Sequence, residues 1–296
     1  MIYSTLGTSD LNVSRIGYGC MSLSTNEKES ISLLHMALDL GINFWDTANI
    51  YNDGVNETII GKALKGIRDK VIVATKAGNV RRPDGGLDWN PSKQHILTCA
   101  EESLKRLDID VIDLYQLHGG TIQDNIDETI EAFEQLKREG KIRYYGISSI
   151  RPNVIREYIK RSSIVSVMTQ YSLLDRRPEE ETLDLLNKNK IGVLVRGAVA
   201  QGLLINKPAK KYLDHSENDV SKAAKAVSDL SVNRTATQTS INYVLQHPAV
   251  TCAVVGMRTS EQIRDAVKTI QAPLLSPNEI TFLQDATTAI RYKEHR

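Results

Sequence analysis

The chain has few cysteines and no long apolar run. Its 296 residues include only three cysteines, Cys20, Cys99 and Cys252, with no Cys-x-x-Cys pair and no cluster of cysteine with histidine. This pattern excludes a disulfide framework and does not suggest zinc, and it favours a reducing compartment such as the cytoplasm. No stretch of about 18 apolar residues occurs, and the first residues carry no basic and apolar leader pattern. We therefore expect neither a membrane span nor a targeting segment.

An excess of one charge is also missing. The 37 lysines and arginines balance 36 aspartates and glutamates, which leaves a net charge of +1. Such a chain has no strong field to attract a polyanion or an anionic lipid surface, so we expect no nucleic acid and no membrane as partner. A 41% hydrophobic content over this length is enough for one large core, and we predict a single domain over residues 1–296. The composition gives no indication of the oligomeric state.

Short strand-like runs alternate with amphipathic helical segments along the chain. Eight such runs are expected, at residues 14–18, 42–45, 71–75, 111–117, 142–147, 164–168, 192–195 and 251–255. Helical patterns with one apolar face lie between them, for example at residues 94–107 and 126–136. Helix starts are indicated by Asn56 before residues 57–64, by Ser92 before residues 94–107 and by Pro152. Eight repeats of strand and helix predict an α/β fold in which parallel strands close into a (β/α)8 barrel, or TIM barrel. Residues 2–5 and 11–13 predict an N-terminal β-hairpin ahead of the barrel.

Two connections in this scheme are longer than ordinary loops, residues 77–89 and residues 200–220. Long loops in a compact barrel are usually functional or mobile. The first contains Arg81 and Arg82, which either meet an anionic substrate or are simply solvated. Trp89, at the end of the same loop, either lines a pocket or anchors the loop.

Four polar residues lie at the ends of strand-like runs or in the turns that follow them: Asp46, Tyr51, Lys76 and His118. The carboxyl ends of the strands form one rim of a barrel, and barrel enzymes place their reactive groups on this rim. The four side chains are therefore expected to meet at one site.

These residue types suit proton transfer to an oxygen atom. Tyr51 is the candidate donor, but a phenol with an ordinary pKa of about 10 needs help near neutral pH. A Lys76 cation about 4 Å away would stabilise the phenolate by roughly 4 kcal/mol at an effective dielectric near 20, and is expected to lower that pKa. Asp46 would hold the ammonium group, and His118 would bind the substrate oxygen or share in proton transfer.

Taken singly, each of the four has a structural explanation. Asp46 can cap a helix, Tyr51 can anchor a loop, Lys76 can be a solvated strand end, and His118 can be a buried histidine with satisfied hydrogen bonds. Together they favour a catalytic site, because four compatible roles at the ends of three successive strands rarely coincide by chance.

Longer stretches of the chain carry a recognisable pattern. They include GTSDLNVSRIGYGCMSL, DTANIYNDGVNETIIGKAL, VIVATKAG, SLKRLDIDVIDLYQLH, GKIRYYGISS, TQYSLLDR, GVLVRGAVAQGLL and VVGMRTSEQI. Over nearly its whole length the chain resembles the aldo-keto reductase superfamily, whose members are NADPH-linked enzymes built on this barrel. The resemblance implies that Asp46, Tyr51, Lys76 and His118 form the catalytic set, and that Tyr51, His118 and Trp89 contact substrate.

The resemblance also implies a cofactor, NADPH or NADP+, and residues that bind it. These are Gly19, Cys20, Met21, Asp46, Ser148, Ser149, Gln170, Arg196, Gly256, Met257, Arg258, Thr259, Ser260 and Gln262. Ser148, Ser149 and Gln170 would hold the nicotinamide carboxamide. Residues 256–262 open a helix whose N-terminal amides favour a phosphate, and Arg258 would pair with a 2′-phosphate.

Some of these residues have alternative explanations. Ser149 can cap the helix that begins near Pro152. Arg258 can be a surface arginine at a helix start, and Cys20 can be a small apolar filler rather than a reactive thiol.

Two positions depart from the pattern of the resembled superfamily. Arg196 stands where many members place an aromatic ring that stacks on the nicotinamide, and its guanidinium can stack while adding positive charge. Gly119 and Gly120 follow His118 where bulkier residues often shape the substrate wall, which predicts an open pocket there.

The resemblance and the four polar residues predict a cytoplasmic, NADPH-dependent oxidoreductase. Its partner would be a small carbonyl compound, an aldehyde or ketone, which is reduced to an alcohol with a proton from Tyr51. The alternative is an NADPH-binding regulatory or sensor subunit of the same fold with little turnover. A barrel hydrolase or lyase would need paired carboxylates or metal ligands, and the sequence offers no convincing set and no metal site. The physiological substrate and the strictness of the preference for NADPH over NADH are not encoded in any motif.

Overall fold

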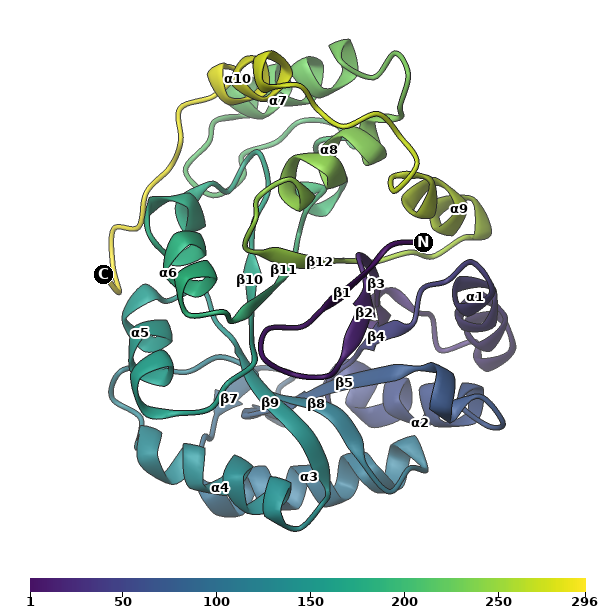
Figure 1. Ribbon diagram of the computed structural model, residues 1–296, viewed down its shortest axis with the longest axis vertical. Helices are drawn as coiled ribbons and strands as arrows, with labels where there is room; N and C mark the ends of the chain where they lie inside the picture. The colour runs from purple at the N-terminus through teal and green to yellow at the C-terminus, as the bar shows by residue number, and fades with distance from the viewer.

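The computed structural model describes residues 1–296, and its centre is a closed barrel of eight parallel strands (Figure 1). The strands are β3 (Ile16–Gly19), β4 (Phe44–Asp46), β5 (Ile72–Ala77), β8 (Ile112–Leu117), β9 (Ile142–Ser148), β10 (Ser166–Gln170), β11 (Gly192–Arg196) and β12 (Val250–Val255). Each pairs with the next in this order, and β12 pairs back with β3 to close the barrel. The predicted α/β class and (β/α)8 barrel are confirmed.

Helices surround the barrel on its outside (Figure 1). They are α1 (Glu27–Asp39), α2 (Val55–Ala63), α3 (Lys93–Leu107), α4 (Ile126–Arg138), α5 (Pro152–Arg161), α6 (Thr182–Lys188), α7 (Glu217–Asp229), α8 (Ala236–Leu245), α9 (Ser260–Lys268) and α10 (Pro277–Asp285). Capping explains several of the starts: the Ser92 hydroxyl accepts a hydrogen bond from the His95 amide, and a capping box opens α8 at Thr235. No helix is both long and apolar enough to cross a membrane.

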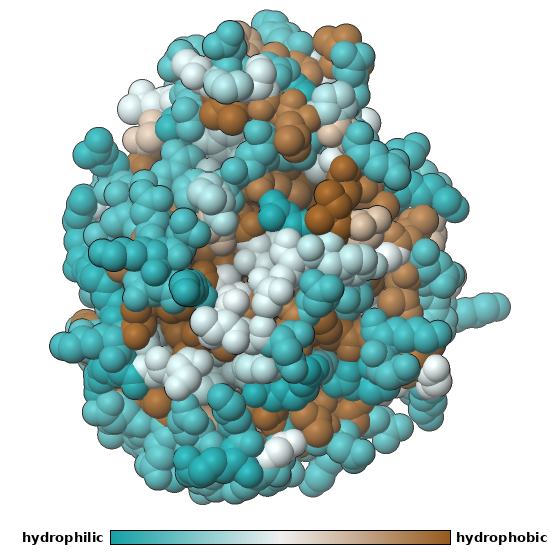
Figure 2. Space-filling view, in the orientation of Figure 1, coloured by the Kyte–Doolittle hydropathy of each residue, from teal (hydrophilic) through white to brown (hydrophobic).

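The predicted hairpin is present as β1 (Tyr3–Thr5) and β2 (Asn12–Ser14), which pair antiparallel. In Figure 1 it lies in front of the barrel, across the end where the strands begin. Leu6, Leu11 and Val13 are buried and pack with the residues inside the barrel. Figure 2, in the same orientation, shows mostly hydrophilic residues around the edge of this face. The hairpin therefore closes the N-terminal end of the barrel.

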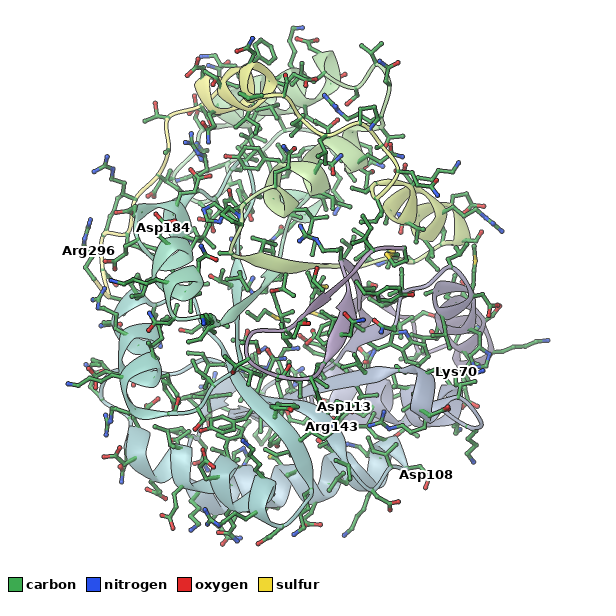
Figure 3. The ribbon with its side chains drawn as sticks, viewed as in Figure 1. Lys70, Asp108, Asp113, Arg143, Asp184 and Arg296 are labelled. Atoms are coloured by element: carbon green, nitrogen blue, oxygen red, sulfur yellow. The ribbon has the colours of Figure 1, made fainter.

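A chain of charged residues ties the hairpin to this end. Asp113 of β8 accepts hydrogen bonds from Arg68 at 2.8 Å, from Arg143 at 2.9 Å and from the Val73 amide at 2.8 Å. Arg143 also bonds Asp10 of the hairpin at 2.7 Å. Figure 3 labels Asp113 and Arg143, which lie close together beside the strands.

The residues inside the barrel form a cluster separate from those between strands and helices. The inner cluster has 11 buried residues, among them Phe44, Ala74 and Leu114, whereas the outer cluster has 64. Trp45 belongs to the outer cluster, as expected from strand alternation next to Asp46. Successive side chains alternate between the two faces of a strand. Membership of the inner or the outer cluster therefore shows which residues of each strand point into the barrel.

The middle of the barrel is tightly packed. A Cβ added to Gly17 would lie 2.9 Å from the Cys252 sulfur, and one added to Gly146 would lie 2.4 Å from the Ser166 hydroxyl. Beyond this filled layer, toward the carboxyl ends of the strands, the last side chains that point into the barrel are polar. These are Asp46, Lys76, Gln116, Ser148, Gln170 and Arg196.

The structure corrects or adds to the sequence prediction in three segments. Helix α2 begins at Val55 with Gly54 as its N-cap, so Asn56 lies inside the helix rather than ahead of it. The long connection at residues 77–89 is an antiparallel hairpin made of β6 (Asn79–Arg81) and β7 (Leu87–Trp89). The long connection at residues 200–220 contains a short 3-10 turn and a bridge between Tyr212 and His215.

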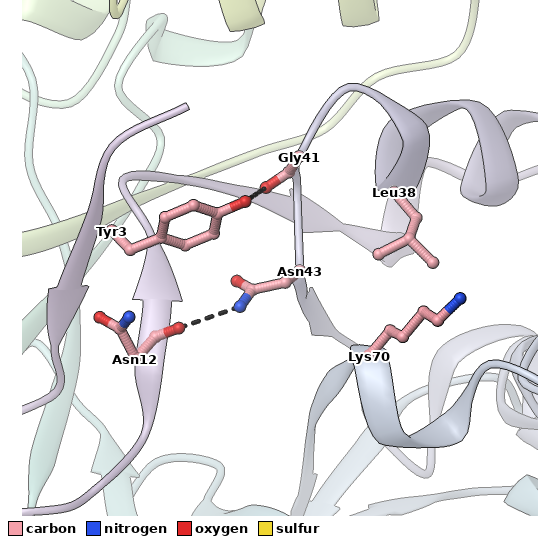
Figure 4. Close-up of a pocket in the computed structure, with 6 residues that line it drawn as sticks. All are labelled: Tyr3, Asn12, Leu38, Gly41, Asn43 and Lys70. Carbon is pink, nitrogen blue, oxygen red and sulfur yellow. Dashed lines mark hydrogen bonds between the residues drawn. The ribbon is translucent and has the colours of Figure 1, made fainter.

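An open hollow of about 470 Å³ lies at the N-terminal end (Figure 4). It is bordered by Tyr3, Asn12, Leu38, Gly41, Asn43 and Lys70. The Tyr3 hydroxyl donates to the Gly41 carbonyl at 3.1 Å, and the Asn43 amide donates to the Asn12 carbonyl at 2.9 Å. These bonds hold the hairpin against the loop before β4, and the hollow lies at the opposite end from the four predicted catalytic residues.

Candidate active site

A buried ion pair forms the base of the site. The Lys76 ammonium lies 2.6 Å from an Asp46 carboxylate oxygen and donates to the Thr47 carbonyl at 2.6 Å. The lysine and aspartate side chains are only 1% and 6% exposed. Burial favours the neutral amine, but the charges and hydrogen bonds of Asp46 and Tyr51 together outweigh it and raise the pKa of Lys76. Lys76 is therefore a fixed cation at the carboxyl end of the barrel.

Tyr51 sits on an unusual turn directly after β4. The 3-10 turn η2 (Tyr51–Gly54) contains Asn52 at φ 49° and Asp53 at φ 52°, followed by Gly54 at φ 88°. Left-handed backbone at residues other than glycine is strained and often accompanies functional sites. Arg81 of β6 supports this turn, because it bonds the Asp53 carboxylate at 3.1 Å and the Ile50 carbonyl at 3.4 Å.

The structure brings Tyr51, Lys76 and His118 together. The Lys76 ammonium lies 5.3 Å from the centre of the Tyr51 ring. The Tyr51 and His118 rings meet edge to face with centres 6.0 Å apart. His118 follows β8, and its amide donates to the Ala77 carbonyl at 2.7 Å, which aligns the ends of β8 and β5. The predicted meeting of the four side chains at one rim is what the geometry shows.

The pKa of Tyr51 moves in the opposite direction from the one expected. Burial of the ring raises the pKa, and the positive charge of Lys76 opposes that rise without cancelling it. The expected lowering is therefore wrong for this structure, because removing the phenolate from water costs more than the ion pair returns. Tyr51 is held as a neutral phenol that can donate a proton.

His118 is held neutral as well. Burial, together with the nearby cations Lys76 and Arg196, lowers its pKa to about 3. Its Nδ1 atom is buried and has no partner in the protein. A neutral imidazole beside Tyr51 offers one N–H donor to an oxygen atom rather than a positive charge.

Gln170 and Arg196 lie at the ends of β10 and β11 and contact each other. Arg196 donates to the Gln170 amide oxygen at 2.7 Å, while the amide nitrogen donates to Asp175 at 2.9 Å and to the Tyr212 hydroxyl at 3.2 Å. Both amide hydrogens are thus in use, and only one lone pair of the amide oxygen remains. Gln170 can therefore bind a ligand only by accepting a hydrogen bond.

Asp175 fixes this pair from behind. It is completely buried, and Arg177 holds it through two hydrogen bonds of 2.8 Å and 2.7 Å. The Arg177 guanidinium in turn lies 5.2 Å from the centre of the Tyr292 ring, in the C-terminal segment. The irregular C-terminal segment is thereby connected to the residues at the ends of β10 and β11.

Ser148 and Ser149 lie at the carboxyl end of β9 and are 8% and 5% exposed. The Ser149 hydroxyl accepts a hydrogen bond from the Arg151 amide at 3.2 Å. Helix α5 has Arg151 as its N-cap and no side-chain cap. The alternative role of Ser149 as the cap of α5 is therefore wrong, and its hydroxyl instead stabilises the turn before the helix.

The segment after β12 opens α9 as predicted. Thr259 is the N-cap and its hydroxyl accepts from the Gln262 amide at 3.3 Å, while the Gln262 side chain accepts from the Arg258 amide at 2.7 Å. Arg258 and Ser260 lie at the surface side of this turn. Met257 differs, because its side chain is buried in the outer cluster and its carbonyl accepts hydrogen bonds from two other residues. Its side chain is therefore not free to contact a ligand.

The end of β3 comes close to the end of β12. A Cβ added to Gly19 would lie 3.3 Å from the Gly256 amide nitrogen, so the two backbones nearly touch. Met21 is 69% exposed, whereas Cys20 is completely buried. Burial raises the pKa of the Cys20 thiol well above its usual value, which agrees with the prediction of a small apolar filler.

Trp89 anchors the end of its loop and packs on two glycines, one of them next to His118. Its indole nitrogen donates to Asp124 at 3.0 Å, and its ring lies against the backbone of Gly78 and Gly119. A Cβ at Gly119 would lie 3.0 Å from the ring. The prediction of an open pocket beside His118 is therefore wrong at this position, because the indole fills the space that the glycine leaves.

Arg81 and Arg82 are both paired within the protein. Arg81 bonds Asp53, and Arg82 bonds Asp84 and Asp88, each at 3.2 Å. With these partners the proposed contact of the two arginines with an anionic substrate has no support in the structure.

Sequence reasoning missed several buried polar residues that hold the site. Thr47 donates to Asn56 at 2.6 Å, and Asn56 donates to the Cys20 carbonyl at 2.8 Å. Glu57 accepts from Thr75 at 2.6 Å and from Arg106 at 2.7 Å. The signal in the sequence was the occurrence of polar residues near Asp46 and Lys76 where the pattern calls for apolar ones. The hydrogen-bond partners of these residues could not be predicted, because they are distant in the chain.

The fold and the site define a class of protein. It is a (β/α)8-barrel enzyme in which a neutral tyrosine, a paired lysine and a neutral histidine meet at the carboxyl ends of β4, β5 and β8.

Comparison with known proteins agrees with this class. The sequence pattern of the Aldo/keto reductase family matches residues 15–287. The Uncharacterized oxidoreductase YqkF of Bacillus subtilis (strain 168) is 50% identical over 302 aligned residues, which cover 98% of this chain and 98% of that protein. The holo form of aldo-keto reductase AKR11C1 from Bacillus halodurans has a TM-score of 0.94 at 48% identity, covering 100% of this chain and 99% of that chain. Its apo form has a TM-score of 0.87 at 45% identity, with coverage of 100% and 99%.

The chain belongs to the aldo/keto reductase family. It is an oxidoreductase of that family, and the predicted resemblance is confirmed.

Proposed function

We propose that this protein reduces aldehydes or ketones to alcohols with NADPH and that Tyr51 donates the proton. The observation that supports this most directly is the contact of a neutral, buried phenol with a fixed ammonium and a neutral imidazole at one rim of the barrel. A neutral phenol can protonate an oxygen, and the adjacent cation stabilises the phenolate that remains.

Each residue of the set has a distinct part in this proposal. Tyr51 moves its hydroxyl proton to the carbonyl oxygen as negative charge develops there. Lys76 stabilises the resulting phenolate, and Asp46 keeps Lys76 charged and in place at 2.6 Å. His118 donates a hydrogen bond that orients the oxygen, since its pKa of about 3 leaves the ring neutral at physiological pH. Trp89 would form the wall beside His118.

The residues at the rim fit a nicotinamide cofactor, which supplies a hydride when bound. The buried Nδ1 of His118 has no protein partner, and the carboxyl ends of β3 and β12 offer bare backbone at Gly19 and Gly256. Ser148 and Ser149 would hold the carboxamide, with Gln170 accepting a hydrogen bond from its amide group. The likeness of the whole chain to the holo form of the aldo-keto reductase AKR11C1 also supports cofactor binding.

The choice of NADPH is part of the same proposal. Arg258 stands at the start of α9, where the amides of the first turn and the arginine charge both favour a phosphate. Thr259 and Ser260 are next to it in the same turn. Arg196 would stack on the nicotinamide in place of an aromatic ring, and its bond to Gln170 holds its guanidinium at the mouth of the barrel.

Steady-state oxidation of NADPH with a panel of aldehydes, ketones and dicarbonyls tests the proposal. We expect turnover with at least one carbonyl class and slower turnover with NADH. A protein that binds NADPH tightly yet turns over none of the panel would instead be the regulatory or sensor subunit. None of the relatives named above is described as such a subunit.

Two further predictions belong with this proposal. We propose that residues 1–296 act as one domain and that the protein works in the cytoplasm. The eight strands are drawn from the length of the chain between residues 16 and 255, which supports a single barrel unit.

A further inference from the structure

Gln116 is a buried polar residue inside the barrel that has no part in the proposed proton transfer. It lies on β8, two positions before His118, and is completely buried. Because side chains alternate along a strand, its side chain points into the same end of the barrel as the histidine. A polar side chain at such a position needs a partner.

The partner of Gln116 is the aspartate of the ion pair. The Gln116 amide nitrogen donates to one Asp46 carboxylate oxygen at 3.2 Å, and Lys76 donates to the other at 2.6 Å. If the Gln116 amide group were turned the other way, its oxygen would face the negatively charged carboxylate and repel it. The amide nitrogen is therefore the atom that faces Asp46. The side-chain oxygen of Gln116 is buried and has no hydrogen-bond partner in the protein.

We propose that Gln116 is a positioning residue for the reaction, which holds the Asp46 carboxylate so that its second oxygen faces Lys76. This inference rests on the proposed function for its catalytic consequence. The amide prevents rotation of the carboxylate and stabilises its charged form without adding a charge of its own. Asp46 in turn keeps Lys76 protonated beside Tyr51.

The surroundings of Asp46 determine what loss of this bond would do. The titratable or charged groups that interact with Asp46 are Lys76, Tyr51, Arg196, Cys20 and Cys252. His118 lies beside the Tyr51 ring and is not in direct interaction with Asp46. Burial raises the pKa of Asp46, while the hydrogen bonds from Lys76 and Gln116 oppose that rise. Removing the Gln116 donor therefore lets the carboxylate protonate at a higher pH, and Lys76 then loses its counter-ion.

The decisive variant is Gln116→Met, which keeps the volume of the side chain but removes the donor. We expect the acid limb of its kcat profile to move toward neutral pH by about one unit. Gln116→Glu should behave in the opposite sense. Its protonated form can donate, so its activity should fall as pH rises and a second carboxylate forms beside Asp46.

The matched control is Thr169→Val. Thr169 is completely buried on β10 and its hydroxyl has no partner, but it does not contact the ion pair. If the role of Gln116 is merely structural, Gln116→Met should lower kcat equally at every pH. The midpoint of the acid limb would then be the same in Gln116→Met and in the Thr169→Val control, which would contradict the proposal.

A second measurement does not depend on activity. Carboxyl-carbon NMR of the protein without cofactor follows the titration of Asp46, whose signal is assigned by its loss in Asp46→Asn. We expect the midpoint to rise in Gln116→Met. Midpoints that coincide with the wild type would overturn the role of Gln116, even in a protein that reduces no carbonyl. If Gln116→Met does not fold, the profile of Gln116→Glu decides, and an unchanged alkaline side contradicts the proposal.

Discussion

The two ends of the barrel each hold a buried aspartate paired with cations, but in different surroundings. At the N-terminal end Asp113 is held by two arginines that are 31% and 40% exposed and by a backbone amide. At the carboxyl end Asp46 faces a lysine that is only 1% exposed, beside a phenol and an imidazole. The first set of partners satisfies a carboxylate, whereas the second leaves reactive groups next to it.

The difference shows what separates a structural ion pair from a candidate catalytic one. At the N-terminal end, Arg143 joins Asp113 to Asp10 of the hairpin, so the arginine charge is shared between two carboxylates. The carboxyl end instead combines a compact ammonium with two groups whose pKa values are moved by burial. Unpartnered buried atoms, such as His118 Nδ1, also occur at this end. Perturbed groups of this kind are typical of functional sites.

The largest effect is expected from Tyr51→Phe at the carboxyl end. Loss of the proton donor should lower kcat for carbonyl reduction by about 10²- to 10⁴-fold, with NADPH affinity nearly unchanged. The measurement is steady-state NADPH oxidation together with a binding titration by protein fluorescence.

Tyr3→Phe is the matched control for this change. It removes a tyrosine hydroxyl that donates to the Gly41 carbonyl at the other end of the barrel. We expect its kcat to equal that of the wild type. Turnover of Tyr51→Phe at the wild-type rate would show that another group donates the proton.

The next effect concerns His118 and the dependence of stability on pH. Its pKa is about 3 in the folded protein and 6.5 ordinarily, so the unfolded chain binds more protons between these values. The free energy of unfolding should therefore fall as pH drops from 6.5 toward 3, and His118→Gln should remove this part of the slope. The kcat profile should show no inflection from His118 near pH 6.5.

Urea unfolding at several pH values measures that slope. The control is His295→Gln, which removes an exposed imidazole of the C-terminal segment. Equal slopes for the wild type and His118→Gln would mean that the ring is not held neutral.

A smaller effect, on stability alone, is expected at the N-terminal end. Asp113→Asn weakens its bonds to Arg68 and Arg143 and should lower the free energy of unfolding by about 2 kcal/mol without changing kcat. Asp10→Asn, whose pair with Arg143 is exposed, should change it by less than about 1 kcal/mol. Denaturant unfolding and an activity assay check both, and a large loss of kcat in Asp113→Asn would remove the distinction between the two ends.

The smallest effect is expected from Arg258→Ala at the edge of the site. Because Arg258 is exposed, its loss should weaken NADPH by about tenfold and leave NADH nearly unaffected. Arg264→Ala, which removes an exposed arginine within α9, is the control. The dissociation constants of NADPH and NADH are measured for each variant. An equal loss of affinity for the two cofactors would exclude a contact between Arg258 and the 2′-phosphate.

Most of the barrel could be predicted because its signals are local. Each strand-like run and each amphipathic helix is visible within a window of a few residues, and eight repeats favour one closed topology. The starts of α3 and α5 carry Ser92 and Pro152. The start of α2 was misplaced because Asn56 bonds Thr47 and the Cys20 carbonyl instead of capping the helix.

The candidate site was only partly predictable. The resemblance named Asp46, Tyr51, Lys76 and His118, but the supports of these residues, such as Gln116 and Arg81, come from other strands and loops. Trp89 is the clearest case. No local rule indicates that the indole of one loop packs on the glycine after His118.

The order of apolar and polar residues along the chain determined the fold class, the hairpin and the rim on which the polar side chains would lie, since strand alternation acts between neighbours in sequence. Only the tertiary structure decided the protonation of the site, because burial depends on every element that packs around a group. Burial of Tyr51 raises its pKa by more than the charge of Lys76 lowers it. The identities of the two residues do not determine this balance, because it depends on how deeply the fold buries them.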